Sequence, residues 1–167
     1  MEVLTEGSAA PAFTLQNSNG KSVSLDEYRG KWLVIYFYPK DNTSGCTKEA
    51  MDFSALREEF LSEGCEILGI SPDSPESHAG FITKHDLSVT LLSDPQKETL
   101  AAYGAWGLKK NYGKEYEGVI RSTFLLDPEG TVRYAWKKVQ VRRKTKTCTV
   151  LHASRVLEKL KELKTKV

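Results

Sequence analysis

The strongest constraint on the fold is the run WLVIYFY from Trp32 to Tyr38, the longest apolar stretch in the chain. A stretch that is continuously apolar and rich in β-branched and aromatic residues predicts a strand buried on both faces, as in a parallel sheet covered by helices. Pro39 ends this strand, because proline cannot donate a ladder hydrogen bond. The run is far shorter than the roughly 20 apolar residues of a membrane span, so no membrane association is expected.

Strands and helices are expected to alternate around this strand. Apolar spacing, turn residues and helix caps predict strands at 13–16, 22–25, 66–71, 89–92, 121–126 and 132–136, a helical turn at 26–30, and helices at 47–62, 73–85, 96–103 and 150–163. A βαβ unit followed by a hairpin and a last helix is the thioredoxin-like plan. We therefore expect an α/β, thioredoxin-like fold with an added N-terminal β-hairpin. The length of 167 residues, with no internal repeat or linker, predicts a single domain over residues 1–167.

The three cysteines, at positions 46, 65 and 148, exclude two classes of protein. An odd number, widely spaced and without a C-x-x-C pair, fits neither a disulfide-rich secreted scaffold nor a four-ligand zinc site. The first residues are acidic where a targeting leader would be basic. We therefore expect a reduced, cytoplasmic protein. The net charge of +2 provides no general attraction for nucleic acid.

Cys46 occupies a position that suits thiol chemistry. It follows a buried strand and a polar loop and lies at the start of a predicted helix. Unpaired backbone N–H groups and the helix dipole favour the thiolate there. The hydroxyl of Thr43 can hydrogen-bond the sulfur or an incoming oxygen, and Gly45 lets the backbone approach a ligand closely. The alternative is an inert core cysteine, since free cysteine is often buried. The polar loop favours the reactive interpretation.

Several separated motifs resemble those of one family. The pattern Pro39-x-x-x-Thr43-x-x-Cys46 is similar to the peroxidatic signature of the peroxiredoxins, and the wider sequence resembles the peroxiredoxin Q subfamily, also called bacterioferritin comigratory protein. The strings GISPDS at 69–74, YGAWG at 103–107 and IRSTFLLD at 120–127 stand in the same order as in that subfamily. The resemblance extends from about residue 7 to residue 136.

The resemblance implies specific residue roles. Cys46 would be the peroxidatic cysteine, Thr43 would orient the peroxide, and Pro39 would shield the pocket. Arg121, on a strand remote in sequence, would lie beside the sulfur, where a fixed cation favours the thiolate and stabilises charge on the peroxide oxygens. Glu49 would hold that arginine through a bidentate pair. The alternative for Glu49 is an acid in the first helical turn, stabilised by the helix dipole.

The implied activity is that of a thiol-dependent peroxidase with an antioxidant role in cell redox homeostasis. The Cys46 thiolate would attack hydrogen peroxide or an organic hydroperoxide, leaving a sulfenic acid. No metal or organic cofactor is implied. The reductant would be thioredoxin, glutaredoxin or a low-molecular-weight thiol, and the protein would be a monomer. The alternative is a non-enzymatic thioredoxin-fold redox sensor or chaperone-like module, which would not need a peroxide-shaped pocket.

The sequence does not determine which thiol resolves the sulfenic acid. Many subfamily members carry the resolving cysteine five residues after the peroxidatic one, where this chain has Met51, and others carry it in the next helix, which has no cysteine here. Cys65 should be structural, because the intervening helix spans roughly 20 Å. Two alternatives remain, an external thiol in a one-cysteine mechanism, or Cys148, which we expect in an accessible polar loop at 140–149 beside Lys144 and Lys146.

Two other features of the sequence point to no specific function. The stretch from Gly130 to Leu157 contains no acidic residue and carries eight basic ones: Arg133, Lys137, Lys138, Arg142, Arg143, Lys144, Lys146 and Arg155. We interpret this basic stretch as a solvated edge rather than a nucleic-acid patch. The histidines at 78, 85 and 152 are scattered and do not form a recognisable metal motif.

Overall fold

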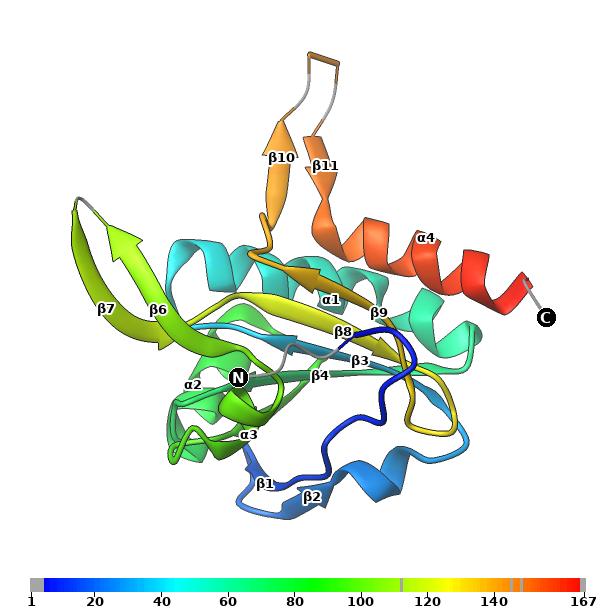
Figure 1. Ribbon diagram of the computed structural model, residues 1–167, viewed down its shortest axis with the longest axis horizontal. Helices are drawn as coiled ribbons and strands as arrows, with labels where there is room; N and C mark the ends of the chain where they lie inside the picture. The colour runs from blue at the N-terminus through cyan, green and yellow to red at the C-terminus, as the bar shows by residue number, and fades with distance from the viewer. Residues whose placement is uncertain (1–4, 112, 145, 148, 166–167) are drawn as a thin grey trace.

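The computed structural model describes residues 5–111, 113–144, 146–147 and 149–165. A seven-stranded sheet with the order β2-β1-β5-β4-β3-β8-β9 forms its centre (Figure 1). The strands are β1 (Thr14–Asn17), β2 (Ser22–Ser24), β3 (Trp32–Phe37), β4 (Cys65–Ser71), β5 (Thr90–Ser93), β8 (Ser122–Leu126) and β9 (Val132–Lys137). Strands β3, β4 and β5 are parallel, whereas β8 pairs antiparallel with β3 and with β9. The expected α/β thioredoxin-like fold with an added N-terminal hairpin, β1–β2, is confirmed.

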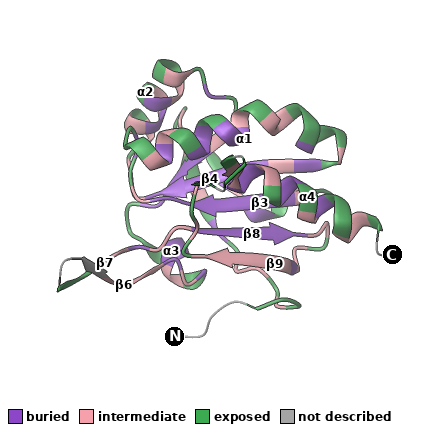
Figure 2. Ribbon diagram, turned by 90° about the horizontal axis from the view of Figure 1, so that it is seen from above, coloured by how far each residue is buried: buried purple, intermediate pink, exposed green. Residues whose placement is uncertain are grey.

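In the described part of the chain, four α-helices and one 3₁₀ turn surround the sheet. They are η1 (Leu25–Tyr28), α1 (Ser44–Ser62), α2 (Pro75–His85), α3 (Glu98–Ala102) and α4 (His152–Thr165). Alternate side chains of β3 enter two cores. Tyr36 packs in the core that α1, α2 and α4 cover, and Phe37 packs in the core on the α3 side. The central strands are buried on both faces, as the apolar run predicts (Figure 2).

Helix α1 begins at Ser44, three residues before the expected start. Thr43 is the N-cap with extended backbone, so Cys46 is the third residue of the helix and lies in its first turn. Sequence periodicity placed the start too late, because Ser44 and Gly45 carry no apolar signal. Most other expected elements are present with small shifts at their ends.

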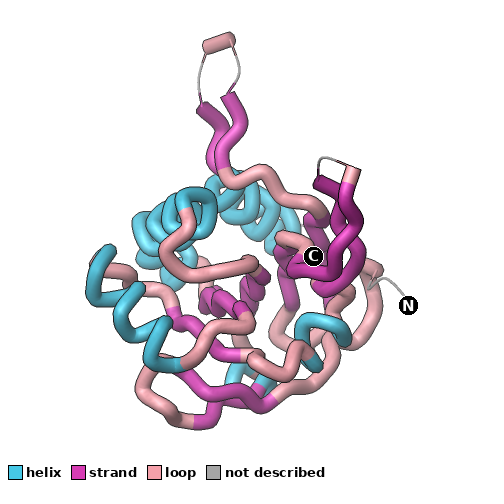
Figure 3. The backbone as a smooth tube through the Cα atoms, turned by 90° about the vertical axis from the view of Figure 1, so that its left-hand side faces the viewer, coloured by secondary structure: helices cyan, strands magenta, loops and turns pink. Residues whose placement is uncertain are grey.

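Two hairpins were not predicted. β6 (Trp106–Asn111) pairs with β7 (Lys114–Val119), where we expected no element, and β10 (Arg142–Lys144) pairs with β11 (Thr149–Leu151), where we expected a polar loop. The predicted start of the last helix at residue 150 is also wrong, since α4 begins at His152. Both hairpins project from the body, and their exposed strands lack the alternation that a buried face imposes (Figures 1 and 3).

No helix in the described ranges is both long enough and apolar enough to traverse a bilayer.

Candidate active site

Cys46 lies at the carboxyl end of the central strand β3. The strand leads into a loop at 38–43, and α1 then begins, with Cys46 in its first turn and only 1% exposed. The first turn of α1 contains no acidic residue. The sulfur therefore lies at the positive end of a 19-residue helix, and no carboxylate in that turn offsets the positive charge.

Arg121 connects Cys46 to Glu49. Because Phe37 pairs with Ser122, strand pairing brings Arg121, the residue just before β8, to the end of β3. Its Nη2 donates to Cys46 Sγ at 3.2 Å, and its Nη1 donates to Glu49 Oε1 at 2.6 Å. The expected bidentate pair with Glu49 is therefore wrong. The guanidinium uses one nitrogen for each partner, which fixes it in a plane beside the sulfur.

The ion pair is largely withdrawn from solvent. The Glu49 side chain is 1% exposed and that of Arg121 18%. Burial raises the pKa of Glu49 to about 7, against the opposing effect of Arg121. Burial lowers the pKa of Arg121, but Glu49 and Cys46 outweigh it, and the net shift is upward. Glu49 Oε2 and the hydroxyl of Tyr36 are buried, and neither has a hydrogen-bond partner among the described residues.

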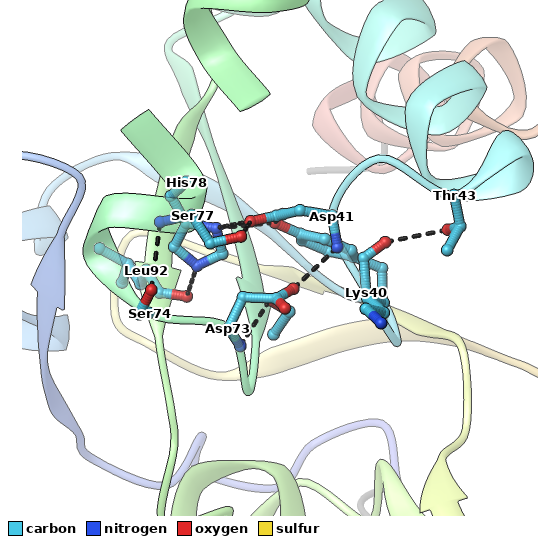
Figure 4. Close-up of polar contacts among 10 residues, drawn as sticks. Lys40, Asp41, Thr43, Asp73, Ser74, Ser77, His78 and Leu92 are labelled. Carbon is cyan, nitrogen blue, oxygen red and sulfur yellow. Dashed lines mark hydrogen bonds and ion pairs between the residues drawn. The ribbon is translucent and has the colours of Figure 1, made fainter. Parts of the chain in front are cut away.

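The hydroxyl of Thr43 is committed as a donor within the loop. Its Oγ1 donates to the carbonyl of Lys40 at 2.9 Å (Figure 4). Although Thr43 is the N-cap residue, its side chain makes no capping hydrogen bond. Its lone pairs are therefore left to accept a hydrogen bond from an incoming group.

An open cleft of about 640 Å³ adjoins Arg121. It is lined by Pro39, Leu108, Lys109, Ile120, Arg121, Lys138 and Val139. The hairpin β6–β7 contributes Leu108, a residue that is 68% exposed. Sequence reasoning missed this wall, because the hairpin itself was not predicted. The lining therefore combines three cationic side chains with four apolar ones.

The other cysteines differ sharply in their positions. Cys65 is 1% exposed and pairs with Trp32 at the opposite end of β3 from Cys46. Burial raises the pKa of its thiol. The interpretation of Cys65 as a core residue is confirmed. Met51 is 45% exposed on α1. Cys148 lies outside the described residues.

A buried polar network that sequence reasoning did not assemble lies behind the loop. It joins Asp41, Asp73 and His78. One oxygen or nitrogen atom of each side chain could bind a metal ion, and these three atoms lie within 4.8 Å of one another (Figure 4). The oxygens of this group already accept hydrogen bonds. Asp41 accepts from the Tyr38 and Ser77 hydroxyls and shares a hydrogen bond with His78 Nδ1 at 2.7 Å. Asp73 Oδ2 accepts from Ser71 and from the Asp41 backbone. The group therefore fits a hydrogen-bonded network better than a metal site.

Several side chains of the basic stretch form ion pairs or hydrogen bonds with other residues of the same chain. Arg142 forms a bidentate pair with Asp52 of α1, at 2.6 and 3.1 Å. Lys137 donates to the carbonyl of Tyr103 at 3.2 Å, and Arg133 lies 3.7 Å from Asp127. Arg142 and Arg133 are therefore paired with carboxylates of the same chain.

Comparison with known proteins agrees with this geometry. The model of the AhpC/TSA family matches residues 7–135. The chain belongs to this family. Peroxiredoxin Bcp of Bacillus subtilis (strain 168) is 44% identical over 160 residues, covering 96% of this chain and 97% of that protein.

Solved structures agree with the family assignment. The bacterioferritin comigratory protein of Xanthomonas campestris, solved as trapped intermediate and ligand complexes to study its alkyl peroxide reduction activity, superposes with a TM-score of 0.83 at 41% identity, covering 98% of this chain and 99% of that chain. A cysteine-to-serine variant of PrxQ from Xylella fastidiosa superposes with a TM-score of 0.87 at 32% identity, covering 98% and 99%.

This peroxiredoxin is a thiol-dependent peroxidase of the Bcp/PrxQ type, as its motifs indicate. A peroxide is its substrate and a thiol its reductant. The alternative of a non-enzymatic redox sensor or chaperone-like module receives no support from these relatives.

Proposed function

We propose that Cys46 is the peroxidatic cysteine of this peroxiredoxin. The observation that carries the proposal is the single guanidinium of Arg121 between Cys46 Sγ and Glu49 Oε1. The thiolate attacks one peroxide oxygen, so that an S–O bond forms as the O–O bond breaks. The peroxide is reduced, the cysteine becomes a sulfenic acid, and the departing oxygen takes up a proton to leave as water or an alcohol.

The neighbouring residues each have a proposed part. Arg121 stabilises the thiolate and the negative charge that grows on the peroxide oxygens. Glu49 holds the guanidinium in place. Thr43 accepts a hydrogen bond from the peroxide hydroxyl, in agreement with its own proton being donated to Lys40. Pro39 lines the cleft beside Arg121 and shields the pocket from water.

The substrates are proposed to include hydrogen peroxide and organic hydroperoxides. The relative from Xanthomonas campestris has been studied for alkyl peroxide reduction. Leu108, Ile120 and Val139 supply apolar surface in the cleft next to Arg121. Such a surface accommodates an alkyl group while the peroxide group reaches the Arg121 guanidinium.

The sulfenic acid is proposed to be resolved by an external thiol or by Cys148. Position 51 carries no thiol, and Cys65 lies at the far end of the sheet. The attacking thiol forms a disulfide with Cys46 and releases water, and a second thiol then reduces this disulfide. Thioredoxin, glutaredoxin or a low-molecular-weight thiol supplies the electrons.

Mass spectrometry after one equivalent of peroxide tests the assignment and the resolving route together. A modification on Cys46 is expected, as a sulfenic acid trapped by dimedone or as a disulfide. A Cys46–Cys148 disulfide selects the intramolecular route, whereas a persistent sulfenic acid selects the external one. Oxidation at Cys65 or Cys148 with Cys46 untouched would refute the assignment.

The setting of the enzyme is also a proposal. Residues 1–167 act as one domain, which is monomeric and cytoplasmic and binds no nucleic acid. The near-neutral charge and the intramolecular pairing of Arg142 support the last point. Light scattering after size exclusion in both redox states tests the monomer.

A further inference from the structure

His78 and Asp41 form a buried pair behind the peroxidatic loop. His78 belongs to α2 and is 0% exposed. Its Nδ1 lies 2.7 Å from Asp41 Oδ2 and 3.3 Å from the Tyr38 hydroxyl, and its Nε2 lies 3.0 Å from the carbonyl of Leu92 on β5 (Figure 4). The pair thus ties the loop at 38–43 to a helix and a strand that contribute no residue to the proposed catalytic group.

The partners of this pair fix the donor at three of its contacts. Leu92 offers a carbonyl oxygen, which only accepts, so His78 Nε2 is the donor there. Asp41 accepts from the Tyr38 hydroxyl at 2.6 Å and from the Ser77 hydroxyl at 2.8 Å. His78 Nδ1 and Asp41 Oδ2 lie 2.7 Å apart and share one proton between them. With that proton in place, every contact in the group joins a donor to an acceptor.

Two hydrogen bonds hold the peptide group that joins Lys40 to Asp41, one from the network and one from Thr43. The N–H of Asp41 donates to Asp73 Oδ2 at 2.8 Å. The carbonyl of Lys40, in the same plane, accepts from Thr43 Oγ1 at 2.9 Å. Because a peptide group is rigid, the orientation of its N–H determines where its carbonyl points. Asp73 therefore holds the N–H of this peptide directly, whereas the Asp41 side chain, through His78 and Ser77, anchors the residue that bears the N–H. Both restraints limit the direction of the Lys40 carbonyl and so of the Thr43 hydroxyl.

We propose that His78 and Asp41 are positioning residues for the peroxidase reaction. By anchoring Asp41, whose N–H Asp73 holds, they keep the 40–41 peptide in an orientation in which Thr43 donates its proton to the Lys40 carbonyl and turns its lone pairs toward an incoming hydroperoxide. The proposal rests on the function proposed above for Thr43. It requires neither residue to touch the substrate.

Two substitutions of His78 separate positioning from packing. In His78→Asn the amide nitrogen takes the place of Nδ1 and keeps a donor toward Asp41, whereas in His78→Gln it takes the place of Nε2 and keeps only the contact with Leu92. We expect His78→Gln to slow Cys46 oxidation by peroxide about 10- to 100-fold, a size typical of a misplaced catalytic group. His78→Asn should stay within about 5-fold of the unmodified enzyme.

Two controls accompany these variants. Alkylation of Cys46 by iodoacetamide, which does not need Thr43, should change little in either variant. His85→Asn on the same helix should leave both rates unchanged, because His85 packs against Phe81 outside the network. Equal losses in the Asn and Gln variants, or parallel losses in alkylation, would overturn the proposal. Should both variants fail to fold, Ser77→Ala removes one donor to Asp41 and should slow peroxide oxidation alone.

A double-mutant cycle with Thr43→Val separates this proposal from the one on which it rests. If His78 acts through Thr43, His78→Gln should cause no further loss in a Thr43→Val background. Full additivity of the two losses would refute positioning through Thr43. If Thr43→Val alone leaves peroxide oxidation unchanged, the proposed function of Thr43 fails instead.

Discussion

Arg121 Nη2 lies 3.2 Å from Cys46 Sγ, although 75 residues separate the two in the sequence. The contact exists because β8 pairs with β3 in a register that joins Ser122 to Phe37. Nη1 of the same guanidinium is held by Glu49 at 2.6 Å. A cation with one nitrogen on the sulfur and another on a buried carboxylate has little freedom to turn away.

Replacing Arg121 should therefore slow the reaction with peroxide. Arg121→Ala should lower the rate constant for Cys46 oxidation about 100-fold or more, the usual effect of removing a donor that stabilises developing charge. Arg121→Lys should recover only part of this loss, since an ammonium group cannot hold both partners in a planar fork. Stopped-flow tryptophan fluorescence measures the rate, and Arg29→Lys on the exposed surface is the control. Full activity in Arg121→Lys would contradict the bridging geometry.

The cysteines should differ completely in function. Cys46→Ser should abolish peroxide consumption, whereas Cys65→Ser should keep nearly all of it and lose about 1–3 kcal/mol of stability from a buried hydroxyl. Consumption of hydrogen peroxide in the presence of a thiol reductant, together with urea unfolding, measures both effects. Substantial turnover by Cys46→Ser would show that the assigned nucleophile is wrong.

Gly45 should be required for the position of Arg121. A Cβ at this residue would lie 3.3 Å from Arg121 Nη2, so the guanidinium would have to shift. Gly45→Ala is expected to slow peroxide oxidation about 10-fold. Gly80→Ala in α2 is the matched control, because a Cβ there meets nothing within 4 Å. That variant should keep its activity and gain about 0.5–1 kcal/mol of stability. Equal activity of the two variants would argue against a close contact at Gly45.

Glu49 should make stability depend on pH. Burial raises its pKa from 4.5 to about 7, so between these values the folded state binds more protons than the unfolded state. The free energy of unfolding should therefore fall as pH rises through this window, by about 3 kcal/mol in total. In Glu49→Gln this fall should disappear, and the variant should gain stability relative to the unmodified protein between pH 4.5 and 7.5. Urea unfolding across that range is the test, and parallel pH profiles would contradict the shift.

His152 should have the opposite dependence. Burial, with help from Arg155 and Arg121, lowers the pKa of this histidine from 6.5 to about 4. Between pH 6.5 and 4 the histidine is protonated in the unfolded state but not in the folded state. The free energy of unfolding should therefore fall as pH decreases. The loss should reach about 3 kcal/mol.

His152→Gln isolates this contribution. Glutamine keeps a polar group near Thr123 Oγ1, which lies 2.8 Å from His152 Nε2. The difference in stability between this variant and the unmodified protein should move in favour of the variant below pH 6.5. A constant difference from pH 4 to 7.5 would mean that the histidine titrates normally.

The sequence alone determined the features that depend on neighbouring residues. The apolar run Trp32–Tyr38 specifies a central strand, and the polar loop that follows it marks a helix start with a cysteine at the dipole end. The motifs around Cys46 and Arg121 were sufficient to recognise the family. These signals are short in range, because periodicity and capping act over a few residues.

The family resemblance placed Arg121 beside Cys46, and the tertiary structure alone decided how the guanidinium binds there and which other distant groups meet. It replaced the expected bidentate pair of Glu49 with a bridging arginine, and it brought His78 and Asp41 together from separate elements. It also formed the hairpin that brings Leu108 to the cleft. The physical reason is that strand register and helix packing set these distances, and both result from burying the whole set of apolar side chains at once.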